Sequence, residues 1–167
     1  MSSKTFVRAL FAVAVIFGLG AGTASAQTTD TAVVTYEVEA ITLLNLSGAA
    51  SVKIVAGTAG QPLDSVTDST GVTYDITNNL GDGSKKLVGK INSAMPANTV
   101  LSVNVTAPAG AVSEDFVALT TSDQDLVTGI DNVVALLVPI SFKLDATVDA
   151  GVVASATKTF TMTVVAS

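Results

Sequence analysis

Hydrophobic and polar positions alternate along much of this chain, most clearly in the C-terminal stretch from Ala156 to Val165. Threonine takes every second place there, and mainly apolar side chains fill the places between: Lys158, Phe160, Met162 and Val164. A β-strand sends successive side chains to opposite faces, so a period of two separates a hydroxyl face from an apolar face. The stretch therefore predicts a strand that packs one face on a core.

Similar runs recur through the rest of the chain, and residues typical of turns separate them. They predict strands over 32–46, 51–55, 66–69, 72–77, 87–91, 100–105, 116–119, 126–130, 133–147 and 156–165. Asp82-Gly83 suits a tight hairpin, and Pro139 indicates a bulge or an edge position, because proline donates no hydrogen bond to a sheet. Roughly eight to ten short strands, with no long helix, indicate an all-β protein built as an antiparallel β-sandwich.

The first 26 residues have the pattern of a secretory signal peptide. Lys4 and Arg8 flank the start of an apolar run from Ala9 to Gly20, and Ala24-Ser25-Ala26 supplies small residues for cleavage. The apolar run is short for a membrane span. We therefore expect cleavage, no membrane span afterwards, and one mature β-sandwich domain over 27–167. That domain would be extracellular or on the cell surface, passing through a periplasm if the cell has an outer membrane. A retained membrane anchor is the alternative.

Composition narrows the chemistry of the mature domain. It has no His, Cys, Trp or Arg, and its six lysines stand against 14 acidic residues, a formal charge of −8. Nucleic acid is not an expected partner, because phosphate binding needs a basic patch. Serine and threonine lack the usual activating histidine, so we do not expect an enzyme. Without cysteine there is no disulfide, so stability must come from an apolar core or from partner subunits.

Two sets of carboxylates are candidate sites. Glycoside cleavage needs two carboxylates at a set separation; Glu37 and Glu39 share a predicted strand face, but with so few aromatic residues nearby we interpret them as a solvated face. Asp123, Asp125 and Asp131 stand in predicted loops, where their oxygen atoms predict a weak calcium site. Their spacing does not fit the twelve-residue calcium loop, and ordinary acidic turns are the alternative. No other cofactor is expected.

Two predicted strands could pair outside their own domain, because they lie near the ends of the mature chain. The stretch from Ala32 to Ile41 offers alternating apolar side chains as a strand donor: Val34, Tyr36 and Val38. The C-terminal stretch offers acceptor side chains: Phe160, Met162 and Val164. A donated strand binds a sheet edge through backbone hydrogen bonds, and its alternate side chains set the register. Alternatively, both stretches are ordinary edge strands of one closed sandwich.

Six segments, all in the second half of the chain, carry a resemblance to known proteins: Met95-Pro96, Thr99–Val103, Asp125–Ile130, Ile140–Thr147, Gly151–Ser155 and Thr159–Thr163. Together they resemble small secreted bacterial proteins with an Ig-like β-sandwich. The alternating C-terminal strand is also similar to that of fimbrial subunits assembled by donor-strand exchange. The chain lacks the cysteine pair of the commonest such pilins and the N-terminal motif of type IV pilins, so no functional residue is carried over.

These observations favour a structural role. We expect a subunit of an extracellular fibre or surface matrix, similar to a pilin or fimbrin, whose partners are copies of itself or other surface subunits. The alternative is a monomeric secreted module for adhesion or carbohydrate binding. In that case Tyr74 and the Asp123–Asp125 loop would contact the glycan.

Overall fold

The computed structural model describes residues 29–79 and 84–167, and these contain nine strands. The predicted signal peptide and the predicted Asp82-Gly83 turn lie outside the described residues. The chain divides into two units, Met1–Glu37 and Val38–Ser167, and every strand belongs to the second. No helix within the described part is long and apolar enough to span a membrane.

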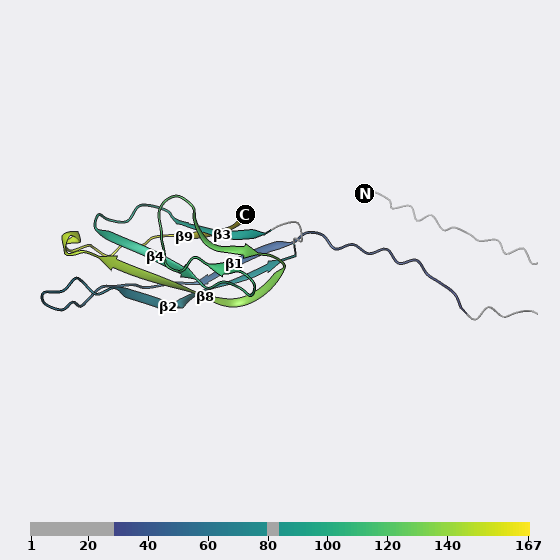
Figure 1. Cartoon of the computed structure of the whole chain (residues 1–167), viewed down its shortest axis with the longest axis horizontal. Helices are drawn as coiled ribbons and strands as arrows, with labels where there is room; N and C mark the ends of the chain where they lie inside the picture. The colour runs from purple at the N-terminus through teal and green to yellow at the C-terminus, as the bar shows by residue number, and fades with distance from the viewer. Residues whose placement is uncertain (1–28, 80–83) are drawn as a thin grey trace, which may run out of the picture. The chain divides into compact units, whose positions relative to one another are not determined.

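The strands form two antiparallel sheets that pack face to face as a β-sandwich, which confirms the predicted fold class (Figure 1). The five-stranded sheet runs in the order β1 (Thr42–Gly48), β2 (Val66–Asn78), β8 (Val133–Ala146), β4 (Thr99–Val105) and β6 (Val117–Ala118). The four-stranded sheet runs in the order β5 (Val112–Ser113), β7 (Gln124–Ile130), β3 (Lys85–Ile91) and β9 (Phe160–Ala166). A short 3-10 turn, η1 (Val148–Ala150), follows β8.

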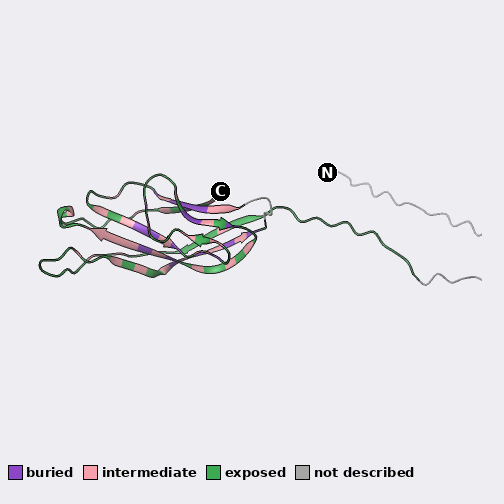
Figure 2. Ribbon diagram, viewed as in Figure 1, coloured by how far each residue is buried: buried purple, intermediate pink, exposed green. Residues whose placement is uncertain are grey.

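The core lies between the sheets and follows the period of two. In β2 the inward residues Val72, Tyr74 and Ile76 are buried, and the residues between them are partly exposed (Figure 2). The opposite sheet contributes buried side chains from three strands: Leu87, Ile91, Leu126, Val127, Ile130 and Met162. Burying one such aliphatic side chain stabilises the fold by about 1.5–3 kcal/mol, so a core of Val, Leu and Ile can replace the absent disulfides.

The predicted strand 32–46 is wrong up to residue 41, and the predicted strand 51–55 does not form. Residues 29–41 and 51–55 belong to no strand, and β1 begins only at Thr42. The reason for the first error is geometric: β2 ends at Asn78, and the ladder closes where the Asn79 N–H donates to the Ile41 carbonyl at 3.1 Å. Residues 38–40 therefore have no strand partner among the described residues.

Pro139 lies in the centre of a sheet, in β8, and the register of β8 against β2 shifts just before it. The Thr106 N–H donates to the Pro139 carbonyl at 3.2 Å, but proline has no N–H to return to the Thr106 carbonyl. The Tyr74 hydroxyl donates to that carbonyl instead, at 2.7 Å. The buried tyrosine thus replaces the hydrogen bond that the proline cannot form, and desolvation raises the pKa of its hydroxyl far above the usual range.

Replacing Tyr74 with phenylalanine should leave the Thr106 carbonyl without this partner. We expect Tyr74→Phe to lower the free energy of unfolding by about 1–2 kcal/mol in urea denaturation. In a Pro139→Ala background the restored backbone N–H can serve the same carbonyl, so the tyrosine substitution should cost less there. Equal costs in both backgrounds would contradict the proposed exchange of partners.

Candidate functional site

The acceptor residues predicted from the sequence lie together on β9, an edge strand. β9 pairs with β3 on one side, and no strand among the described residues pairs with its other side. Met162 is buried in the core, while Phe160 and Val164 are half-buried and pack against it. The Phe160 ring meets the Phe142 ring edge-on at 5.3 Å between centroids. All three side chains therefore face inward from a strand whose outer side is open.

The backbone hydrogen bonds of β9 show which of its residues direct their N–H and carbonyl groups to the open edge. The Asn92 N–H donates to the Thr159 carbonyl at 3.0 Å, and the Ser167 N–H donates to the Ser84 carbonyl at 3.1 Å. In an antiparallel ladder the residues that bond to the neighbouring strand alternate. The odd-numbered residues from Thr159 to Ser167 therefore face β3. The N–H and carbonyl groups of the even-numbered residues face the open edge, and these include Phe160, Met162 and Val164.

β1 lies beside β9 at the corresponding edge of the five-stranded sheet. Its inward residues Leu44 and Leu46 pair with Ile76 and Tyr74, both of which are fully buried. Leu44 is nevertheless only half-buried, and Leu46 is exposed. The opposite sheet ends at β9, so nothing in the described chain covers the inner face of β1 completely. Leu44 and Leu46 therefore form an incompletely covered apolar strip on β1, the strand beside β9.

The predicted donor residues belong to no strand. Val34, Tyr36 and Val38 are 78 to 89% exposed. Residues 34–38 form no hydrogen bond in the described structure. On either side of them, the Thr31 N–H donates to the Asp30 carboxylate at 2.8 Å, and the Asn79 side chain donates to the Glu39 carbonyl at 3.0 Å and accepts from the Ile41 N–H. The segment thus keeps a free backbone and an alternating apolar row, as a donor strand requires.

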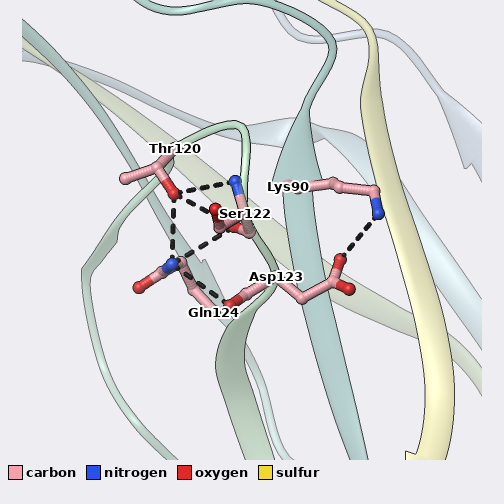
Figure 3. A network of polar contacts seen from close by, with 5 residues as sticks. All are labelled: Lys90, Thr120, Ser122, Asp123 and Gln124. Carbon is pink, nitrogen blue, oxygen red and sulfur yellow. Dashed lines mark hydrogen bonds and ion pairs between the residues drawn. The ribbon is translucent and has the colours of Figure 1, made fainter.

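The structure pairs two of the three predicted calcium ligands, Asp123 and Asp125, with lysines. The Asp123 carboxylate pairs with Lys90 at 3.1 Å, and the Asp125 carboxylate pairs with Lys86 at 2.9 Å. The loop before Asp123 closes on itself, because the Thr120 hydroxyl accepts from Ser122 and Gln124 (Figure 3). At Asp131 the backbone carbonyl, and not the carboxylate, accepts from the Asn78 amide at 2.9 Å. No group of three His, Cys, Asp or Glu side chains within 29–79 and 84–167 could hold a metal ion.

Tyr74 cannot contact a glycan as the alternative function required, because its side chain is fully buried and its hydroxyl is bonded to Thr106. The period of two in β2 already placed Tyr74 on the same face as Val72 and Ile76, and that face is the core. The other part of that expected glycan site is the Asp123–Asp125 loop. Both aspartates are exposed, but each carboxylate is paired with a lysine.

Sequence reasoning missed a carboxylate that joins three strands. The Asp75 carboxylate in β2 accepts from the Leu137 N–H in β8 at 2.7 Å and from the Asn45 amide in β1 at 3.1 Å. These bonds, the first above all, lower the pKa of Asp75. Leu137 has φ +53°, a left-handed conformation that is rare for leucine. The pairing depends on strand register, so the alternation of β2 alone showed only an outward Asp75.

Hydrogen bonds also lower the pKa of two other carboxyls. Asp68 accepts first from the Ser51 N–H at 2.9 Å, then from Thr70 and Gly71. Asp145 accepts from the Ser65 hydroxyl and pairs with Lys143 at 3.2 Å. Each carboxylate joins the strand that carries it to a neighbouring strand or loop, so ionisation of these groups supports the folded state.

We expect stability to fall in acid because of these three carboxyls. Folding lowers their pKa, so the stability they contribute is complete above about pH 4 and is lost as the pH falls through their folded pKa values. The melting temperature of Asp75→Asn should fall less between about pH 5 and pH 2.5 than that of the unchanged chain. Asp149→Asn is the matched control, since in the described structure its carboxylate makes no hydrogen bond or ion pair. Parallel curves for Asp75→Asn and the unchanged chain would contradict this role.

Comparison of the chain with protein-family models, with curated proteins and with solved structures finds no match. The candidate site is therefore defined by its own geometry. It consists of an uncharged edge strand, β9, whose apolar residues face the core while their backbone groups face outward, and of an incompletely covered strip on β1.

Proposed function

We propose that the mature protein is a structural subunit of an extracellular fibre or surface matrix that assembles by strand donation. Residues 34–38 of one copy pair with the open edge of β9 in the next. The observation that carries this proposal is the open β9 edge, at which Phe160, Met162 and Val164 direct their side chains inward and their backbone groups outward. The exposed, unpaired segment with Val34, Tyr36 and Val38 supplies the complement.

The absence of edge protection supports this proposal. Natural proteins blunt an exposed edge strand with charged residues, proline or a bulge. β9 reads Phe-Thr-Met-Thr-Val-Val-Ala, and its pairing with β3 is regular along its whole length. The nearest charged residue in the sequence before the strand is Lys158, whose ammonium group donates to the Ser93 hydroxyl and the Ala94 carbonyl. An edge of this kind pairs readily with another strand, which suits a subunit made to assemble.

Apolar and polar residues alternate both in the donor segment and in β9, and this alternation specifies the register in which the two would pair. In an antiparallel arrangement Tyr36 lies opposite Met162, Val38 opposite Phe160 and Val34 opposite Val164. The three apolar side chains then extend the core and cover the strip on β1. Thr35 and Glu37 join Thr161 and Thr163 on the outer face, which is exposed in β9. A slip by one residue would turn Glu37 inward, and the cost of burying its charge makes this register selective.

Paired cysteines can test the register, because the chain has no cysteine of its own. Thr35 and Thr163 form a non-hydrogen-bonded pair in the proposed arrangement, with Cα atoms about 4.5 Å apart, a separation that a disulfide spans. We expect the mature chain with Thr35→Cys and Thr163→Cys to form a ladder of disulfide-linked oligomers on a non-reducing gel. Thr35→Cys with Thr161→Cys is the matched control, since that diagonal pair is about 7–8 Å apart and should link poorly.

Two other outcomes would overturn strand donation. A disulfide within single chains would show that the segment completes its own sandwich, as the closed alternative requires. Monomers without disulfides, at concentrations where fibres are expected, would favour a monomeric binding module. Deleting residues 27–39 gives an independent check, because the remaining chain keeps every strand but loses the donor and should not assemble.

A further inference from the structure

A second apolar surface lies on the outer face of the five-stranded sheet, away from the core. Leu43, Val134, Leu136 and Leu137 are 63 to 80% exposed there, and we refer to them as the outer patch. The register places Leu43 and Val134 on either side of Thr77 in one row across the sheet. Exposed residues follow β1 and the bend at the start of β8 (Figure 2). Grouped apolar side chains of this kind mark interaction surfaces.

A β-bulge in β8 keeps two leucines of the outer patch, Leu136 and Leu137, away from the core. The register of β8 against β2 shifts between Ile76 and Tyr74, so Leu136 and Leu137 together oppose Asp75. Leu137 takes φ +53° there, and its N–H donates to the Asp75 carboxylate. The Asn45 amide on β1 holds that carboxylate from the other side. Neither leucine packs on the core. Backbone strain that a polar network maintains, without benefit to the core, indicates a functional surface.

The covalent chain determines which molecule can reach this surface. The donor residues end at Val38, four residues before Thr42, and four residues span at most about 14 Å. Thr42 pairs with Asn78, which pairs with Val133, so these three form the end row of the sheet. Leu43 and Val134 occupy the next row. A copy that holds residues 34–38 against its β9 must therefore lie close to the outer patch.

We propose that the outer patch is a second subunit contact, which packs against the copy that accepts the donated strand. This inference rests on the proposed function, because the short connection from Val38 to Thr42 brings the two copies together. Each mature subunit carries a formal charge of −8, so neighbouring copies repel each other. A patch without charge provides attraction where the copies meet. Two linked contacts also raise the effective concentration of each, so assembly depends on both.

The experiment uses the mature chain throughout. It distinguishes loss of the outer-patch contact from loss of strand donation. The patch variant carries Leu136→Thr and Leu137→Asn; threonine suits a strand, and asparagine tolerates positive φ. Sedimentation velocity measures the concentration at which chains with an intact donor assemble. We expect the patch variant to need roughly tenfold more protein than the unchanged chain, because about 1.4 kcal/mol of lost contact free energy is a factor of ten. The matched control is Val55→Thr with Val112→Thr, which removes two exposed apolar side chains elsewhere and should assemble normally.

A second measurement reports strand donation alone. A Tyr36→Asp chain cannot donate its strand, so it stays monomeric with an open β9 edge, and a labelled peptide of residues 29–41 should bind it in fluorescence anisotropy. The patch substitutions should leave that peptide affinity unchanged within about twofold. Thermal unfolding of the patch variant checks that it folds as the unchanged chain does.

Each outcome decides the proposal. Assembly that needs a higher protein concentration, with unchanged peptide affinity, supports the outer patch as a second contact. Normal assembly of the patch variant overturns it while leaving strand donation intact. Equal losses of assembly and peptide affinity overturn it as well, since the substitutions would then act on the β9 edge. Failure of the peptide to bind any chain refutes strand donation itself, and the patch proposal falls with it.

Discussion

A backbone N–H or carbonyl that is withdrawn from water needs a hydrogen-bond partner, and this sandwich meets that need with side chains where its ladders fail. Pro139 cannot donate to the Thr106 carbonyl, and the Tyr74 hydroxyl does so from the core. Leu137 leaves the ladder at the bulge of β8, and the Asp75 carboxylate accepts its N–H. On the open side of β9 no strand of the described chain supplies such partners.

The same constraint links the fold to the proposed assembly. The five-stranded sheet extends to β1, whereas the opposite sheet ends at β9, so Leu44 and Leu46 lack full cover. One further strand beside β9 would satisfy its outward backbone groups and cover that strip at once. Residues 34–38 of another copy have the alternation to do so.

Much of the fold was predictable from local pattern. The clear alternation in 72–77 and 100–105 predicted strands that do form, because each keeps one face on the core along most of its length. The same alternation in 32–41 predicted a strand that this chain lacks, since the pattern describes the side chains and says nothing of a partner strand. The proline of β8 indicated a bulge or an edge, and the bulge proved to lie beside it in a central strand.

The acceptor residues were also predictable, because Phe160, Met162 and Val164 share one face of a strand and that face needs a core. The sequence by itself thus determined the fold class, the inward face of each regular strand and the uncharged character of β9. Only the tertiary structure decided that β9 is an edge, that its apolar residues turn their backbone groups to the open side, and that Asp75 supports an exposed pair of leucines. Those features depend on which strands become neighbours and in what register, and such pairings join residues far apart in the chain that no local pattern connects.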